Sequence, residues 1–168
     1  RPFRDMPALV ADLLPTVRAA LEHGPCALFG HDIGAITAYE LIRALRREGG
    51  PLPVHLFVSA SMAPHTYYAP PMHLYDEARF LEALDLFGYV PPEGRAWAQV
   101  RELATADHAL IAHYTDSAEP PIDVPISAFV GTRDLYIPAR AVRAWRQQTT
   151  AAFALPFAEV GIVSVFFT

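Results

Sequence analysis

Apolar residues recur with helical spacing near the start of the chain, over residues 7–21. The positions that set this period are Leu9, Val10, Leu13, Leu14, Val17 and Leu21. Asp5 stands just before the stretch and is predicted to cap it, while Gly24-Pro25 ends it. We therefore expect an amphipathic helix that packs one face against the rest of the protein.

A short, continuous apolar run follows at residues 26–29 and leads directly into the turn G-H-D-I-G at residues 30–34. Such runs are typical of parallel strands that are buried on both faces. Residues 35–47 then have the pattern of a helix, and residues 54–59 that of a second buried strand. This alternation predicts an α/β domain with a mostly parallel sheet and helices on both faces.

The middle of the chain has a different character. Residues 64–71 are rich in Pro, Tyr and His, and the pattern after them predicts three helices, over residues 75–87, 95–103 and 105–114. Pro120-Pro121 closes this insertion. We expect residues 65–120, taken approximately, to form a helical lid over a site, within one domain that spans residues 1–168.

Strand patterns return after the insertion. Residues 126–130 predict a buried strand, residues 131–134 (G-T-R-D) the turn that ends it, and residues 139–148 a helix. The apolar end of the chain, residues 153–167, is sufficient for one or two further strands. The sheet is thus expected to continue on both sides of the insertion.

Composition narrows the function classes. The 168 residues are 52% hydrophobic and 18% charged, which excludes intrinsic disorder and fits one domain with a real core. The net charge of −5 argues against a nucleic-acid partner and against anionic membranes, and no apolar run is long enough to span a bilayer. Cys26 is the single cysteine, so no internal disulfide is possible and a cytoplasmic location is expected.

The turn at residues 30–34 has the form G-x-D-x-G between a strand and a helix. A sharp strand-to-helix turn needs small residues on both sides of its apex, here Gly30 and Gly34. Asp32 at the apex would project from the end of the sheet, and the Ile33 N–H could donate to an oxyanion. The alternative is that Asp32 only caps the following helix. The neighbouring His31 is expected to be a packing residue.

Asp134 ends a later strand, where an acid could orient a catalytic histidine or simply close a turn. A triad in the usual order requires a histidine after this acid, but His113 is the last one, so no catalytic histidine is found. His65 and His73 are interpreted as loop or lid structure, as are the nearby tyrosines 67, 68 and 75. The sequence contains neither metal-ligand spacing nor a nucleotide motif, so we expect no metal and no cofactor.

Four blocks of the chain resemble one known family in order and spacing. Residues 27–35 (A-L-F-G-H-D-I-G-A) are similar to its central turn, which reads LFGHSMGA, and residues 39–45 continue the helix after it. Residues 55–65 resemble its next strand and loop, and residues 125–150 its acid-bearing strand and the helix that follows. The family is the type II, or editing, thioesterases of polyketide and nonribosomal peptide synthases, which are α/β hydrolases.

The resemblance implies a cytoplasmic hydrolase of antibiotic biosynthesis that releases acyl groups from the phosphopantetheine arm of an acyl or peptidyl carrier protein. It places Asp32 at the nucleophile position and Asp134 at the position of the triad acid. The backbone N–H of Ile33 would be one oxyanion donor, and the lid helices would frame the acyl channel. No cofactor is implied.

Three departures from the family pattern change these expectations. Asp32 replaces the family's serine, and Val165, within residues 161–167, stands about where its histidine would be. The family also begins with strands and an oxyanion loop that this chain lacks, so we expect a truncated and altered copy whose own activity is impaired or lost. Apolar surface that these strands would cover is then expected to lie open at the edge of the sheet, with low solubility or self-association.

Two alternatives therefore stay open. An aspartate in this turn also resembles the epoxide hydrolases and haloalkane dehalogenases, in which the carboxylate forms an ester with the substrate. The second alternative is a non-catalytic remnant that binds a carrier protein or an acyl chain.

Overall fold

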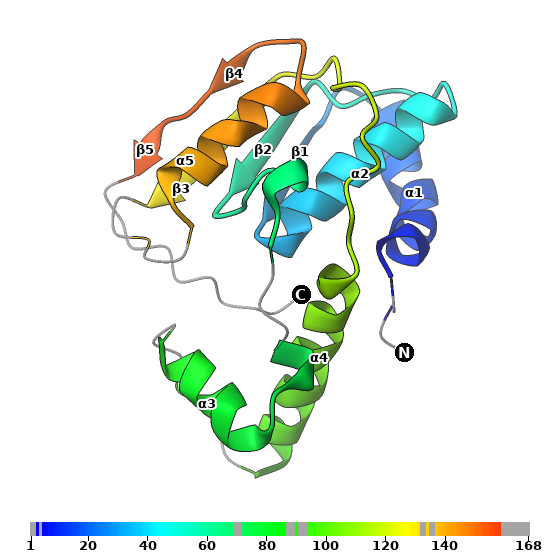
Figure 1. Cartoon of the computed structure of the whole chain (residues 1–168). Helices are drawn as coiled ribbons and strands as arrows, with labels where there is room; N and C mark the ends of the chain where they lie inside the picture. The colour runs from blue at the N-terminus through cyan, green and yellow to red at the C-terminus, as the bar shows by residue number, and fades with distance from the viewer. Residues whose placement is uncertain are drawn as a thin grey trace.

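A parallel sheet with helices packed against it forms the frame of the chain (Figure 1). The computed structural model describes residues 3, 5–68, 72–86, 90, 94–131, 134 and 137–158. The elements are α1 (Met6–Glu22), β1 (Ala27–His31), α2 (Ile33–Arg47), β2 (His55–Ser59), the 3-10 turns η1 (Pro64–Thr66) and η2 (Met72–Leu74), α3 (Glu77–Leu86), α4 (Gly94–Ala112), β3 (Ile126–Gly131), α5 (Ala139–Arg143), η3 (Ala144–Gln148), β4 (Phe153–Ala154) and β5 (Phe157–Ala158).

The sheet order is β1-β2-β3-β4, with β5 paired to the end of β3, and every pairing is parallel. This confirms the predicted α/β class. Because all strands point the same way, their carboxyl ends meet at one edge of the sheet. Asp32 follows β1 and Asp134 follows β3 at that edge, so the topology alone brings the two predicted acids to the same end.

The core lies between the sheet and α2. Ile36, Ile42 and Leu56 are fully buried there, and burying one such side chain contributes about 1.5–3 kcal/mol. Trp145 of η3 packs edge-on against Tyr39 of α2, with ring centroids 5.5 Å apart, and its indole N–H donates to the Ser61 carbonyl at 2.9 Å. This contact places α2 and the α5–η3 segment on the same face of the sheet.

On the other face, the odd-numbered residues of β1 and β2 are less covered. Phe29 of β1 pairs in register with Phe57 of β2, and the Phe29 side chain is 67% exposed. The sheet therefore carries an exposed aromatic side chain on this face, and the missing strands that were expected to leave apolar surface open stay a prediction. The coverage of this face by helices stays a prediction.

The insertion contains α3 and α4, which lie below the sheet in Figure 1. They share a small apolar cluster of their own, formed by Phe80 and Leu84 of α3 and Ala104 of α4. The prediction of two helices over residues 95–114 was wrong, because α4 runs unbroken through Ala104 and Thr105, where neither Gly nor Pro interrupts it. That this insertion serves as a lid stays a prediction.

The remaining boundaries follow the sequence closely. Asp5 caps α1 as predicted, its carboxylate accepting the Ala8 N–H at 2.8 Å. The helix predicted over residues 139–148 is α-helical only over its first five residues and continues as the 3-10 turn η3. Of the predicted strand region 153–167, β4 and β5 are seen, and residues 159–167 lie outside the described part of the chain. No helix within the described residues is long and apolar enough to span a membrane.

Candidate active site

The turn after β1 has the strained backbone of a strand-to-helix elbow. Asp32 adopts φ +51° and ψ −119°, a conformation that costs a non-glycine residue of order 1–3 kcal/mol. Its N–H donates to the Ser59 carbonyl of the neighbouring strand at 2.9 Å, which fixes the apex to the sheet. Gly30 is sterically required, since a Cβ there would overlap the Gly34 carbonyl and lie 2.5 Å from the Ala35 backbone.

The expectation that both flanking residues must be small is only half right. A Cβ on Gly34 would meet no atom within 4 Å among the described residues, and Gly34 does not need a positive φ. The crowding is one-sided because Gly30 lies under the first turn of α2, whereas Gly34 is already part of that helix. The elbow therefore depends on Gly30.

Asp32 does not cap α2 through its side chain, so the capping alternative was wrong within the described chain. Its Oδ1 instead accepts a hydrogen bond from the Tyr67 hydroxyl at 3.3 Å. The Tyr67 ring meets the edge of Tyr114, with centroids 6.4 Å apart, and the Tyr114 hydroxyl donates to Glu40 at 2.8 Å. This chain of contacts holds Tyr67 over the elbow.

Tyr67 is a site residue that the sequence pattern does not predict. Nothing in the local pattern distinguished it from Tyr68, which is 69% exposed on the same loop. The only signal was its place a few residues after the end of a strand, and that signal applies to both tyrosines equally.

The Asp32 carboxyl has an unusual environment. Burial raises its pKa to about 6, and the nearby negative charges of Asp107 and Asp134 act in the same direction, while the Tyr67 hydrogen bond opposes them. Burial and the Asp32 charge also raise the pKa of Tyr67 well above its ordinary value, so its hydroxyl stays a donor. A carboxyl poised near neutral pH can act as an acid or a base.

Asp134 both closes a turn and influences the elbow. Its carboxylate accepts the Ile137 N–H at 2.9 Å, and its own N–H donates to the Gly131 carbonyl at 3.1 Å. Its charge raises the pKa of Asp32 and partly offsets the lowering that burial imposes on the pKa of His31. The two predicted acids therefore interact electrostatically.

Histidines do not complete a triad in the described part of the chain. None of those described there hydrogen-bonds to Asp32. His31 lies 3.2 Å from the Ser59 hydroxyl, His65 lies 2.6 Å from the Gln148 amide, and the ring centroids of His73 and His113 are 6.2 Å apart. His31 and His65 thus bond to neighbouring side chains, and the interpretation of His31, His65 and His73 as structural residues stays a prediction. Val165 and the segment 161–167 lie outside the described residues.

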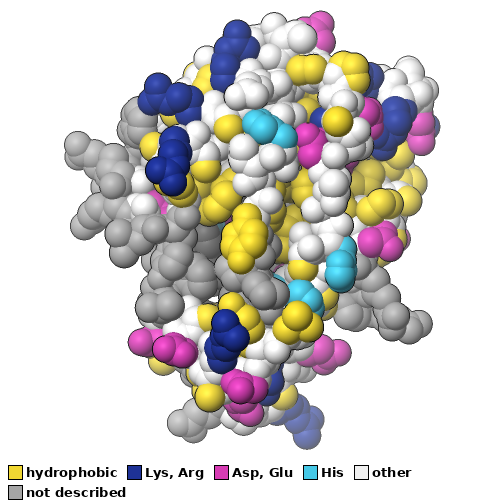
Figure 2. All heavy atoms as spheres, viewed as in Figure 1, with side chains coloured by type: hydrophobic (Ala, Val, Ile, Leu, Met, Phe, Trp, Pro, Cys, Tyr) yellow, Lys and Arg dark blue, Asp and Glu magenta, His cyan; other side chains and the backbone are white. Residues whose placement is uncertain are grey.

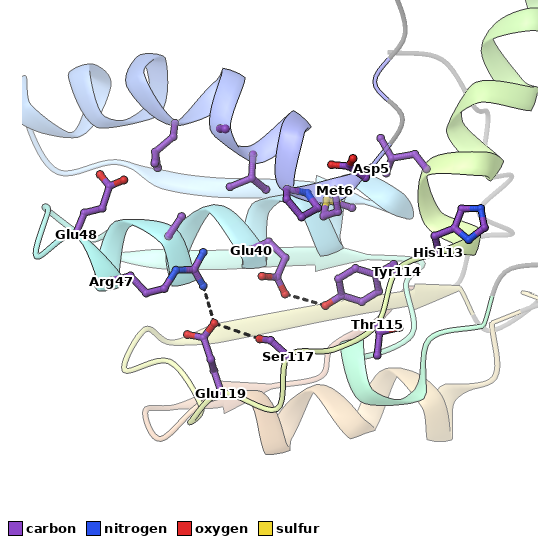
Figure 3. Close-up of a pocket in the computed structure, with 16 residues that line it drawn as sticks. Asp5, Met6, Glu40, Arg47, Glu48, His113, Tyr114, Thr115, Ser117 and Glu119 are labelled. Carbon is purple, nitrogen blue, oxygen red and sulfur yellow. Dashed lines mark hydrogen bonds and ion pairs between the residues drawn. The ribbon is translucent and has the colours of Figure 1, made fainter.

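A groove of about 490 Å³ runs along α2, between α1 and the segment that follows α4 (Figure 3). Apolar side chains line much of it, among them Val10 and Leu14 of α1 and Leu110 of α4. Tyr114 forms part of its wall and also contacts Tyr67, so this tyrosine pair connects the groove to the elbow. The described residues include no group of three side chains able to hold a metal ion.

Comparison with known proteins identifies the family. The sequence model of the thioesterase domain matches residues 1–161. The gramicidin S biosynthesis protein GrsT of Aneurinibacillus migulanus is 31% identical over 136 residues, which are 78% of this chain and 53% of GrsT. The thioesterase TesA of Mycobacterium marinum is 30% identical over 92% of this chain and 63% of its own length.

Solved structures agree. RedJ, a thioesterase of the prodiginine pathway in Streptomyces coelicolor, superposes with a TM-score of 0.84 at 33% identity over 94% of this chain and 60% of RedJ. YbtT, the type II thioesterase of the yersiniabactin pathway, superposes with a TM-score of 0.82 at 27% identity over 95% of this chain and 67% of YbtT. The chain thus spans a little over half to two thirds of the length of these proteins. None of these relatives is an epoxide hydrolase or a dehalogenase, so the comparisons do not favour either alternative. The fold is that of the α/β-hydrolase thioesterases, and the chain belongs to the thioesterase family.

Proposed function

We propose that the protein hydrolyses acyl thioesters carried on the phosphopantetheine arm of an acyl or peptidyl carrier protein, in the cytoplasm. The family supports the reaction class, and the pathways named for GrsT, RedJ and YbtT support a role beside a polyketide or nonribosomal peptide synthase. The observation that carries the proposal is the Asp32 carboxyl, held at a strained elbow with its pKa near 6.

Asp32 is proposed to act as a general base rather than as the nucleophile that its position implies. Attack by the carboxylate itself would give an anhydride, and none of the histidines among the described residues hydrogen-bonds to Asp32, where a base would be needed to hydrolyse it. As a base, Asp32 takes a proton from water while the water oxygen bonds to the thioester carbonyl carbon. The carbon–sulfur bond then breaks, and Asp32 returns the proton to the leaving thiolate.

Two neighbours are proposed to assist this step. Ile33 is the first residue of α2, so its N–H has no acceptor within the helix and can donate to the developing oxyanion. The negative charge of Asp134 helps to keep the Asp32 pKa close to neutral, which suits a base that must also release its proton. The apolar groove beside Tyr114 fits the acyl portion of the substrate.

The test is thiol release from acetyl-pantetheine and from an acetyl-loaded carrier protein, compared among wild type, Asp32→Asn and Asp32→Ser. We expect Asp32→Asn to lower the rate by about 100-fold or more, since the base is lost. Asp32→Ser should be as slow, because a serine hydroxyl cannot take up the proton. Absence of turnover by the wild type would refute the proposal, as would undiminished turnover by Asp32→Asn, and a faster Asp32→Ser would restore the serine mechanism of the family.

A further inference from the structure

The outer face of α5 and η3 carries an arginine at every third position. Arg140, Arg143 and Arg146 are exposed, whereas Val142 and Trp145 on the opposite side are buried against the rest of the chain. A spacing of three residues places side chains in line on one face of a helix that ends in a 3-10 turn. We call these three residues the arginine row. Figure 2 shows basic side chains gathered over the part of the molecule where Figure 1 draws α5.

The charges of the arginine row are not neutralised within the described part of the chain. None of its members forms an ion pair there, and Arg146 donates instead to the Thr149 carbonyl at 3.2 Å. Most other described arginines do have partners. Carboxylates pair with Arg18, Arg43, Arg46, Arg47 and Arg101, and Arg79 lies over the Tyr75 ring.

The arginine row begins beside the candidate site. The charge of Asp134 raises the pKa of Asp32, and the Asp134 carboxylate accepts a hydrogen bond from the Ile137 N–H, two residues before α5 starts. From Arg140 to Arg146 the row then extends about 10 Å along the surface, given the rise of 1.5–2 Å per residue. A partner bound along the row would thus lie next to the elbow.

We infer that the arginine row is the docking surface for the acidic face of the carrier protein, around the phosphodiester that attaches its pantetheine arm. This inference rests on the proposed function. The chain as a whole has a net charge of −5, and the arginine row is a local positive region on this acidic molecule, so it is a place where an anionic partner is attracted. Arginine suits this role, because its planar fork binds phosphate and carboxylate groups.

The experiment compares wild type with Arg140→Gln/Arg143→Gln/Arg146→Gln on two substrates, an acetyl-loaded carrier protein and acetyl-pantetheine, which has neither protein nor phosphate. We expect the triple variant to lose about tenfold in kcat/KM on the carrier substrate at low salt, with the loss fading as salt is added. Its kcat/KM on acetyl-pantetheine should be unchanged. Arg95→Gln is the matched control and should change neither, since Arg95 is exposed at the start of α4 and forms no ion pair with any described residue.

Equal kcat/KM values of the triple variant and wild type on the carrier substrate would overturn the inference, and so would an equal loss on both substrates. If the wild type hydrolyses neither substrate, the proposed function fails but docking can still be measured. The Kd of the carrier protein, followed by fluorescence anisotropy, then decides: about tenfold weaker binding by the triple variant supports the arginine row, and unchanged binding refutes it.

Discussion

At the scale of single residues, Asp32 links stability to pH. Its pKa is about 6 in the folded protein and ordinary, near 3.9, in the unfolded chain, so the folded state holds the proton more firmly. Stability therefore falls as the pH rises from about 4 to 6, and the ionised carboxylate destabilises the fold above that window. Asparagine has nearly the same shape as aspartate but carries no charge. We predict that Asp32→Asn is more stable than wild type by about 2–3 kcal/mol at pH 8, and that this gain disappears at pH 4.

Urea unfolding at both pH values measures this difference. Asp12→Asn is the matched control, since it is the same substitution at an exposed position on α1, outside the buried elbow. A stability difference between Asp32→Asn and wild type that is the same at pH 4 and pH 8 would show that the carboxyl is not perturbed by burial.

At the scale of elements, the elbow shows how β1 and α2 share one turn. A Cβ on Gly30 would overlap the backbone of the first turn of α2, whereas a Cβ on Gly34 would meet open space. We predict that Gly30→Ala lowers the free energy of unfolding by about 3 kcal/mol or more, because the helix must shift. Gly34→Ala should instead be neutral or stabilise by about 0.5 kcal/mol, as alanine favours the helix.

The two alanine variants control for each other, because they add the same methyl group four residues apart. Their midpoints in urea measure the contrast. Equal effects on stability would mean that the close approach of β1 and α2 at Gly30 is absent in solution.

The elbow shows which features of the site can be predicted from the sequence and which cannot. The strand, the turn with Asp32 and the helix after it are local features, so periodicity and turn residues were sufficient to find them. The partner of Asp32 could not be found in this way, because Tyr67 reaches it across 35 residues and only folding brings the two together. The space beside Gly34 and the unbroken course of α4 likewise depend on packing, which periodicity does not report.

At the scale of the whole molecule, the two faces of the sheet differ. Even-numbered residues such as Leu56 and Val58 are fully buried on the helix-covered face, and the Trp145–Tyr39 contact closes that face. On the opposite face, Phe29 is 67% exposed and stands beside Phe57 on the neighbouring strand. Exposed aromatic residues on a strand at the end of the sheet order favour association between molecules.

We therefore predict that this chain self-associates as its concentration rises, and that Phe29→Ser weakens the association. Stability should change by no more than about 0.5 kcal/mol, since an exposed side chain contributes little to the core. Sedimentation velocity over a concentration series measures the effect. Leu74→Ser is the matched control, because Leu74 is 74% exposed but lies on η2, away from the sheet. A wild-type chain that stays monomeric throughout the series would contradict the prediction, and an equal effect of Leu74→Ser would show that exposed apolar residues in general, rather than this face of the sheet, cause the association.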